Sequence, residues 1–434
     1  MTHWQDLYND KRCCAEEAIN CIKNGNRVVV GHACGSPEKL LKTLVKNADT
    51  YKNVEIVHMV SMGASEYCLP EMADHFIHNS LFAGPTTRKA IHEGQAFFTV
   101  SHFSRIPSLF KERVLPVDVT LCMVSPPDEH GFCSFGISVD YTKPAAENSQ
   151  TVIAEVTPHM PRTLGDSFIH VSAIDFIVES ESRPILLPPP KITAIDEKIG
   201  SYCAEIIKDG DCLQLGIGAV PDAMLGFLKD KKDLGIHTEM FSDGVVDLVE
   251  AGVITCAKKN LHPNKMVATF FMGTEKLYRF VHNNPMVQMF PVDYTNNPAV
   301  IARNDNMVSI NSALQIDLTG QAASESIGHK QFSGTGGQAD FVRGAAWSKG
   351  GRSILAFHST ASDGKLSRIV ATLDEGAVVT TTRSDIHFVV TEFGSADLRG
   401  RSVPERAKSL INCAHPAFRD ELKAKFKRLY NVTL

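Results

Sequence analysis

A short internal repeat constrains the fold of this chain more than any other feature of its sequence. Residues 22–26 and 207–211 read Ile-Lys-Asn-Gly-Asn and Ile-Lys-Asp-Gly-Asp, and each is followed by four strand-like residues and a glycine, Gly31 or Gly216. Both copies continue to a proline that opens a helix. Helix, NG or DG turn, buried strand, glycine turn and new helix are typical of a mostly parallel sheet wrapped by helices. The repeat therefore predicts two related α/β halves.

The boundary between the halves is expected at a run of prolines. Pro188, Pro189 and Pro190 fall between the two copies and can continue neither a helix nor a strand ladder. A chain of 434 residues also exceeds what one hydrophobic core usually supports. We therefore expect an N-terminal domain over residues 1–187 and a C-terminal domain over residues 191–434.

Charge and composition exclude several classes of function. The formal net charge of -5 gives no basic footprint, which argues against nucleic acid and favours small metabolites. No apolar run approaches the roughly 20 residues that span a bilayer, and the polar N-terminus has no signal-peptide core, so we expect a cytoplasmic protein without membrane partners. There is no CxxC or HExxH spacing, and His32 with Cys34 is the closest approach to a ligand pair, so no metal is expected.

Glu239 is the leading catalytic candidate from its local pattern. It follows a short apolar run bounded by glycine and precedes a helix start, where Ser242 and Asp243 are suitable caps. Ligands of open α/β sheets bind outside the carboxyl ends of the strands, so an acid at this place can meet a substrate. The alternative is a first-turn acid that binds free helix amides. Glu392, which follows a strand expected over residues 386–390, is the main rival.

Two glycine-rich turns are candidates for contact with a ligand. Gly216, Ile217 and Gly218 form a GxG turn between a strand and a helix, where backbone amides can face an anion. The third glycine of a dinucleotide fingerprint and the lysine of a phosphate loop are missing, so an NAD site is not expected. Residues 334–337, Gly-Thr-Gly-Gly, either let a ligand approach the main chain closely or form a tight structural turn.

Five ordered motifs carry a resemblance to a known family. They are residues 125–131, 235–240, 334–341, 390–394, and 405–407 with 414–416. Over nearly its full length the chain resembles the acetyl-CoA hydrolase/transferase family, and within it the CoA-transferases of butyrate or 4-hydroxybutyrate. The resemblance implies a homodimer of two related open α/β domains of the NagB/RpiA/CoA-transferase-like type. It also implies CoA exchange between acetyl-CoA and a short-chain carboxylate, with CoA as a substrate and no tightly bound cofactor.

The resemblance also assigns roles to residues. It implies that Glu239 attacks the acyl-CoA thioester to form a glutamyl anhydride, which the CoA thiolate converts to a glutamyl-CoA thioester. It implies an oxyanion hole from the backbone amides of Ile217 and Gly337. The implied substrate and CoA contacts are Gly216, Gly218, Asn296, Gly334 and Gly336. Asn296 lies in an Asn-Asn-Pro sequence that equally predicts a turn.

Other polar residues stay open as candidates. Arg343, Lys349 and Arg352 follow the second glycine cluster and either meet the CoA phosphates or serve solubility. His130 and His415 lie in turn-rich segments where a histidine often hydrogen-bonds the main chain.

Two alternative functions remain beside the transferase. The first is acetyl-CoA hydrolase, in which water resolves the glutamyl intermediate, and access of water is what separates the two. The second is a non-catalytic CoA or metabolite sensor on a related fold. A sensor should lack Glu239 or carry a DNA-binding segment, and neither condition holds in this sequence. His237, two residues before Glu239, is expected to support the site because carboxylate exchange needs no proton transfer at neutral pH.

Overall fold

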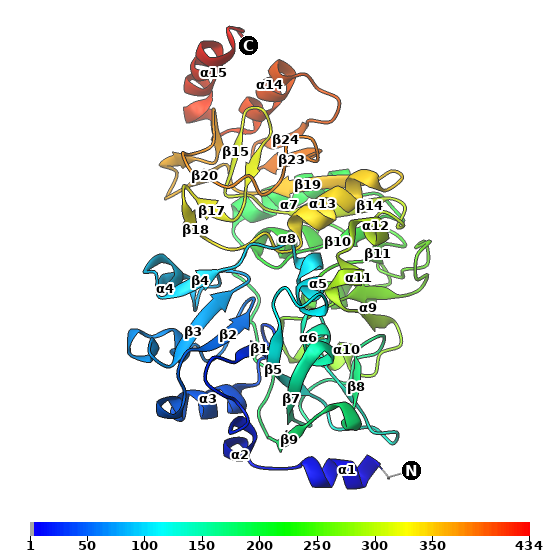
Figure 1. Cartoon of the computed structure of the whole chain (residues 1–434). Coiled ribbons are helices and arrows are strands. Elements are labelled where there is room, and N and C mark those ends of the chain that lie inside the picture. The colour runs from blue at the N-terminus through cyan, green and yellow to red at the C-terminus, as the bar shows by residue number, and fades with distance from the viewer. Residues whose placement is uncertain (1–3) are drawn as a thin grey trace. The chain divides into compact units, whose positions relative to one another are not determined.

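The computed structural model describes residues 4–434 and divides the chain into two compact units (Figure 1). Unit 1 comprises Met1–Pro188 and Val267–Thr295, and unit 2 comprises Pro189–Met266 and Asn296–Leu434. The first crossing between the units therefore falls in the run of prolines.

The segment Val267–Thr295 distinguishes these units from the domains expected over residues 1–187 and 191–434, because it belongs to unit 1. Its strand β13 (Val287–Met289) pairs with β12 (Met266–Ala268). Isolated bridges join Phe270 to Ser138 and Met289 to Gly165. These pairings link residues far apart in the chain, so no local pattern could have predicted the return of the segment.

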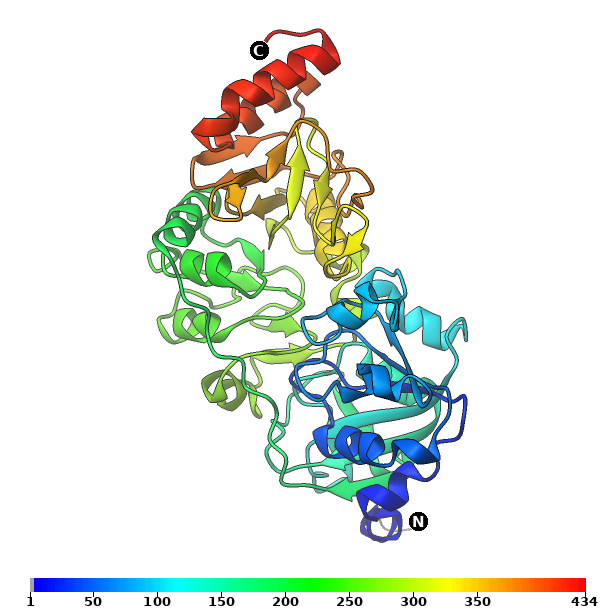
Figure 2. The same cartoon turned by 90° about the vertical axis from the view of Figure 1, so that its left-hand side faces the viewer.

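Unit 1 is built on a parallel sheet, visible in blue and cyan in Figure 2. The spatial order of its strands is β4 (Ala96–Phe98), β3 (Phe76–Ser80), β2 (Val54–His58), β1 (Arg27–Val30), β5 (Val117–Val124), β7 (Ser149–Val156) and β9 (Phe176–Glu179). A ribbon of β6 (Phe132–Ser134) and β8 (Phe168–His170) lies outside this sheet. The α-helices of unit 1 are α1 (Trp4–Lys11), α2 (Ala15–Ile19), α3 (Glu38–Lys46), α4 (Arg88–His92), α5 (Ile106–Lys111), α6 (Thr142–Asn148), α10 (Glu275–Val281) and α11 (Val292–Thr295). Its 3-10 helices are Ala48–Thr50, Glu66–Cys68, Pro70–Met72, Phe103–Arg105 and Val171–Ala173.

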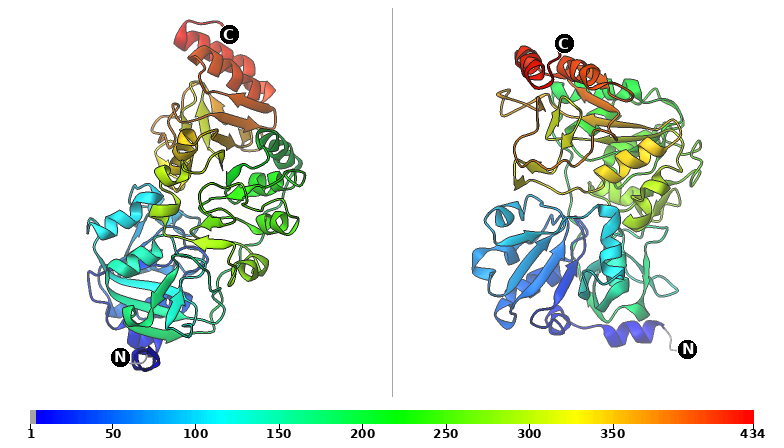
Figure 3. Two further views of the ribbon diagram at one scale, coloured as in Figure 1. Left: turned by 90° about the vertical axis from the view of Figure 1, so that its right-hand side faces the viewer. Right: turned by 45° about the horizontal axis from the view of Figure 1, so that its top comes forward.

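Unit 2 repeats the design with a sheet that is parallel except for its last strand. The spatial order is β11 (Gly235–Ile236), β10 (Cys212–Gln214), β14 (Met307–Asn311), β19 (Arg352–Ala356), β23 (Phe388–Thr391) and β24 (Gly394–Asp397). Its α-helices are α7 (Ala194–Ile206), α8 (Ala219–Leu225), α9 (Asp243–Glu250), α12 (Pro298–Ile301), α13 (Gln338–Trp347), α14 (Val403–Cys413) and α15 (Pro416–Tyr430). Its small strands are β15 (Gln315–Asp317), β16 (Ala322–Ala323), β17 (Ser326–Ile327), β18 (Lys330–Gln331), β20 (Thr360–Ala361), β21 (Leu366–Ser367) and β22 (Ile369–Val370). In Figure 3, α14 and α15 run side by side over the end of the unit, in orange and red.

The two copies of the sequence repeat occupy the same place in the two sheets. β1 lies between β2 and β5, β10 lies between β11 and β14, and every one of these pairings is parallel. Val28, Val29 and Val30 are fully buried, as expected for a parallel strand with both faces covered. The predicted α/β fold class is confirmed, and the carboxyl ends of the parallel strands of each sheet share one edge.

No helix within residues 4–434 combines the length and the apolar character that a membrane crossing requires.

Candidate active site

Glu239 lies just beyond β11, at the carboxyl edge of the unit 2 sheet. The strand itself ends at Ile236, three residues earlier than the predicted strand-end position of the acid. His237 and Thr238 are fully buried, whereas Glu239 is partly exposed. The helix that follows begins at Asp243, as predicted. The carboxylate is therefore presented by a short tether between an edge strand and a helix.

The two neighbouring asparagines, Asn296 and Asn297, make different contacts. The side-chain amide of Asn296 donates a hydrogen bond from Nδ2 to Glu239 Oε2 at 2.8 Å, and Asn296 is fully buried. Asn297 caps α12, because its Oδ1 accepts the backbone N–H of Ala299 at 2.9 Å. The predicted turn is thus present at Asn297, and Asn296 contacts Glu239, while the predicted contact of Asn296 with the substrate stays a prediction.

Gly337 lies against the same carboxylate oxygen that Asn296 binds. A Cβ placed at this position would overlap both Glu239 Oε2 and Asn296 Nδ2, so a larger residue there would displace these two side-chain ends. Gly337 is also the N-cap of α13, a ten-residue helix whose amino end favours a nearby negative charge. Gly336, just before it, has a φ of +52°, and Gly334 begins the same turn. The structure therefore brings Glu239, Asn296 and Gly337 into direct contact.

The first glycine turn, in contrast, is open. A Cβ at Gly216 or at Gly218 would meet no atom within 4 Å, and the side chain of Ile217 is 40% exposed. The turn joins β10 to α8 and is held beside the Glu239 segment by an antiparallel bridge between Leu215 and Met240. The turn therefore has open space on the side where glycine side chains would project.

Two cross-links between these segments were not predicted from the sequence. The Thr238 hydroxyl accepts the N–H of Leu215 at 3.1 Å and shares its proton between Leu215 O at 3.1 Å and Met240 O at 2.8 Å. Ser242 Oγ donates to Asp222 Oδ1 at 2.6 Å. Burial is the main cause that raises the pKa of Asp222 above its ordinary value. The signal available in the sequence was the threonine directly before the candidate acid.

A buried lysine covers the outer edge of β11 and was also missed. Lys259 Nζ donates to Ile236 O at 2.8 Å and to Lys265 O at 2.7 Å. Its stem passes so close to Gly235 that a Cβ there would lie 2.6 Å from Lys259 Cγ. Burial lowers the pKa of Lys259. Nothing in the sequence separates this lysine from an ordinary surface lysine.

The rival acid, Glu392, is already hydrogen-bonded to Ser359 through both of its oxygens. It is 8% exposed, and its two oxygens accept from Ser359 N at 2.9 Å and Ser359 Oγ at 2.5 Å. It lines a pocket of about 790 Å³ together with Lys198 and His358. His358 Nε2 is hydrogen-bonded to Asp196 at 2.7 Å, and this bond is one cause that holds the pKa of Asp196 below its ordinary value.

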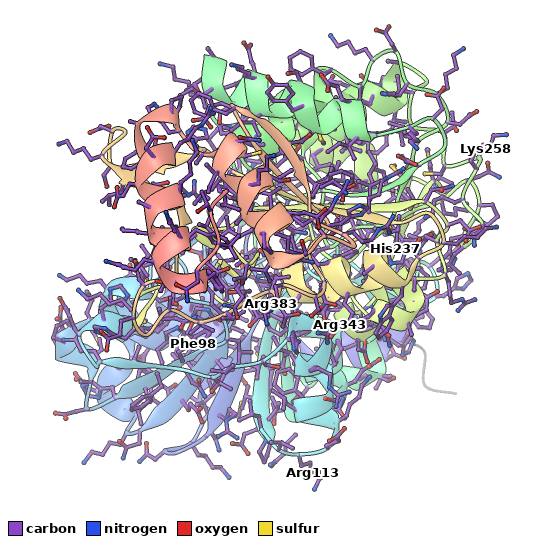
Figure 4. The ribbon with its side chains drawn as sticks, turned by 90° about the horizontal axis from the view of Figure 1, so that it is seen from above. Phe98, Arg113, His237, Lys258, Arg343 and Arg383 are labelled. Atoms are coloured by element: carbon purple, nitrogen blue, oxygen red, sulfur yellow. The ribbon has the colours of Figure 1, made fainter. Side chains whose placement is uncertain are left out.

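The three basic candidates for the CoA phosphates lie in different environments. The side chain of Arg352 is 11% exposed and forms an ion pair with the buried Asp211, so it is committed to a contact within unit 2. Arg343 lies on α13, where it is labelled in Figure 4, and it pairs with Asp385 at 3.1 Å. The side chain of Lys349 is 88% exposed.

Two of the three candidate histidines, His237 and His415, lie in structural positions. His415 is the N-cap of α15, and its Nδ1 accepts the N–H of Ala417 at 3.3 Å. His237, which is labelled in Figure 4, is fully buried. Its ring lies edge-to-face to that of Phe341, with 6.3 Å between the centroids. His130 is exposed.

The unit 1 histidine that came closest to a metal-ligand spacing is held by a carboxylate. His32 Nδ1 is hydrogen-bonded to Asp140 at 3.0 Å. Among the described residues, no group of three or more His, Cys, Asp or Glu side chains is placed to hold a metal ion.

Known proteins resemble the chain along its whole length. Residues 2–188 match the acetyl-CoA hydrolase/transferase N-terminal domain, and residues 273–426 match the C-terminal domain. The chain is 58% identical to 4-hydroxybutyrate coenzyme A transferase of Clostridium kluyveri, over 98% of this chain and 100% of that protein. It is 40% identical to butyryl-CoA:acetate CoA-transferase of Anaerostipes caccae, over 96% of each chain.

Solved structures agree with the sequence comparison. The crystal structure of 4-hydroxybutyrate CoA-transferase from Porphyromonas gingivalis matches with a TM-score of 0.86 and 42% identity, over 99% of this chain and 100% of that one. RipA from Yersinia pestis matches with a TM-score of 0.93 and 38% identity, over the same shares of the two chains. The chain therefore belongs to the acetyl-CoA hydrolase/transferase family and has the α/β CoA-transferase fold. Within that family it is an enzyme that transfers CoA between carboxylic acids.

Proposed function

We propose that this enzyme exchanges CoA between acetyl-CoA and 4-hydroxybutyrate, with butyrate as a related acceptor, and that Glu239 is its nucleophile. The names of its full-length relatives support the substrates. The observation that carries the mechanism is the Glu239 carboxylate, held by Asn296 Nδ2 at 2.8 Å and faced by the backbone of Gly337. Because Glu239 is partly exposed and its neighbours include glycines, a thioester can approach its carboxylate.

In the first step a Glu239 oxygen attacks the acetyl-CoA carbonyl carbon and the C–S bond breaks. The products are an acetyl-glutamyl anhydride and CoA thiolate. The thiolate then attacks the glutamyl carbonyl carbon, acetate leaves, and a glutamyl-CoA thioester remains. Carboxylate suits this task because an anhydride lies near a thioester in energy, whereas a serine nucleophile would form a stable ester.

The second half runs in reverse with the acceptor acid. Its carboxylate attacks the glutamyl-CoA thioester, releasing CoA thiolate and forming an acyl-glutamyl anhydride. The thiolate attacks the acyl carbonyl carbon, which yields the new acyl-CoA and restores the Glu239 carboxylate. No step requires a net proton transfer, so the site needs no general base, and the fully buried His237 serves packing in this scheme.

Each step passes through a tetrahedral oxyanion that needs preset donors. We assign these donors to the backbone N–H groups of Ile217 and Gly337. The open space at Gly216 and Gly218 and the closeness of Gly337 to Glu239 support the assignment. Removal of one such donor in other enzymes has cost about 3 kcal/mol of transition-state stabilisation.

CoA is a substrate in this scheme, and the proposal includes no tightly bound cofactor. It also keeps the expected homodimer. Native mass spectrometry of the purified protein tests both points, since the scheme expects a dimer without a retained non-protein group.

The activity test incubates the protein with acetyl-CoA alone, with 4-hydroxybutyrate and with butyrate, and measures acyl-CoA products and free CoA by mass spectrometry. The proposal expects the acceptor's acyl-CoA and acetate in equal amounts without net release of CoA. CoA released at the same rate without an acceptor would identify a hydrolase instead. Absence of turnover with every short acid would contradict the proposal and favour a sensor.

A further inference from the structure

The tether that carries Glu239 has little support from the sheet itself. β11 is two residues long and lies at the edge of the sheet, so it pairs with β10 on one side only. Its outer side is covered by the Lys259 ammonium, which binds the carbonyl of Ile236. Beyond Ile236, His237 N still donates to Leu213 O at 3.1 Å, and a single antiparallel bridge joins Met240 to Leu215. Glu239 lies between these two main-chain contacts, so side-chain contacts also help to set its position.

Thr238 supplies the first of these contacts. It is fully buried and lies directly before Glu239, and its hydroxyl bonds both backbone groups of Leu215, the residue before the Gly216 turn. A hydroxyl has one proton, so Thr238 accepts one hydrogen bond from Leu215 N and shares its proton between Leu215 O and Met240 O. It fastens the near end of the glycine turn to the Glu239 tether.

Ser242 supplies the second contact, at the far end of the turn. It occupies the N-cap of α9 but makes no capping hydrogen bond, although an N-cap serine usually binds an N–H of the first helical turn. Its hydroxyl goes instead to Asp222 in the first turn of α8, directly after the glycine turn. The serine therefore serves the link between segments rather than its own helix.

From these two cross-links we infer that Thr238 is a positioning residue. With the Ser242–Asp222 link, it holds the Glu239 carboxylate in a fixed place relative to the amides of the Gly216–Gly218 turn. The inference rests on the proposed roles of Glu239 and that turn. Nucleophile and oxyanion donors must both lie about 3 Å from the reacting carbonyl, and displacement by about 1 Å can cost on the order of 100-fold in rate.

A matched control exists in the same sheet. Thr391 is also fully buried and ends a strand, β23, and its hydroxyl donates to Cys413 O at 2.6 Å and accepts from Phe393 N at 3.2 Å. It makes the same kind of bond at another strand end but does not contact the glycine turn. Removal of either hydroxyl costs buried hydrogen bonds, so the two variants separate lost stability from lost positioning.

The experiment compares Thr238→Val, Thr238→Ser and Thr391→Val with the wild-type enzyme. It measures kcat, KM for acetyl-CoA and the single-turnover rate of covalent CoA attachment, with Tm as a check of folding. We expect Thr238→Val to slow attachment and kcat by about 10- to 100-fold while KM stays within about threefold. Thr238→Ser keeps the hydroxyl and should restore the rate, whereas Thr391→Val should lower Tm and leave the rate unchanged.

A wild-type rate in Thr238→Val would overturn the inference. Equal slowing in the Ser and Val variants would also overturn it, because the methyl packing would then matter rather than the hydroxyl. If Thr238→Val does not fold, Ser242→Ala tests the Ser242–Asp222 link, and we expect kcat to fall by about three- to tenfold at unchanged KM. A wild-type rate in Ser242→Ala would contradict the inferred positioning of Glu239.

Glu239→Gln separates this inference from the proposed function. An inactive Glu239→Gln together with a fully active Thr238→Val removes only the positioning role. Turnover by Glu239→Gln would contradict the assignment of Glu239 as nucleophile, and with it the positioning role of Thr238.

Discussion

The two copies of the sequence repeat end in glycine turns with opposite surroundings. In unit 1 the turn is packed: a Cβ at Gly35 would lie 2.7 Å from Ser138 Cβ, and one at Gly31 would lie 3.2 Å from a main-chain oxygen. In unit 2 a Cβ at Gly216 or Gly218 would meet nothing within 4 Å. The glycine turn that follows the buried strand is thus packed in unit 1 and open in unit 2.

The neighbouring strands repeat this contrast. β2 ends in His58, which is buried, and its Nε2 is hydrogen-bonded to the Tyr67 hydroxyl at 2.5 Å. β11 leads instead to Glu239, which is partly exposed. Two units with related sheet topologies can therefore differ in function through the side chains at the carboxyl ends of their strands.

The largest expected effect separates the two strand-end acids of unit 2. Glu239→Gln should lower kcat by about 10⁴-fold or more, because the nucleophile is lost while the shape is kept. Glu392→Gln should keep kcat within about threefold and lower stability, because it weakens buried bonds to Ser359. Steady-state kinetics beside thermal unfolding measure both, and a reversed pattern would make Glu392 the nucleophile.

The buried histidines of unit 1 should make the protein sensitive to acid. Burial lowers the pKa of His78 to about 4, and burial with the neighbouring His78 lowers that of His58. A depressed pKa means that the unfolded chain binds protons first, so stability is present above the unfolded pKa of about 6.5 and is lost as the pH falls towards about 4.

His78→Asn keeps a donor for Ile56 O, which His78 Nδ1 contacts at 3.0 Å, and removes the titration. Between pH 6.5 and pH 5 the wild type should lose about 2 kcal/mol more unfolding free energy than the variant. Urea unfolding at the two pH values measures this difference. Equal losses would show that His78 does not titrate with folding.

Two glycine variants test the packed and open turns directly. Gly216→Ala should leave Tm unchanged and lower kcat/KM by about tenfold, because its methyl enters space reserved for substrate. Gly35→Ala should destabilise unit 1 by about 1–3 kcal/mol through overpacking against Ser138, with kcat close to wild type. If Gly216→Ala lowered Tm and left kcat/KM unchanged, the interpretation of its turn as open substrate space would be wrong.

The smallest effect concerns the double asparagine. Asn297→Ala removes the cap of α12 and should cost about 1 kcal/mol of stability with little change in kcat. Asn296→Ala should instead lower kcat, since it removes the hydrogen bond to Glu239. Similar kcat values for the two variants would contradict the assignment of Asn296 to the active site and of Asn297 to the helix cap.

The sequence predicted the strands and turns of the fold better than the side-chain contacts between distant segments. The repeat located β1 and β10, because turn residues and apolar runs act locally. The hydrogen bonds of Thr238, Ser242 and Lys259 and the Arg352–Asp211 ion pair depend on which segments lie together in space. The local sequence pattern does not encode contacts between distant segments. From the sequence alone, Arg352 therefore resembles a surface cation, and Thr238 has no evident role between His237 and Glu239.

The most direct test of the account is the mass of the intact protein after brief exposure to acetyl-CoA without an acceptor. The account predicts a fraction of chains that carry CoA through a thioester bond, located by peptide mapping to Glu239 and absent from Glu239→Gln. CoA attached to any other residue, or to the Glu239→Gln protein, would contradict it.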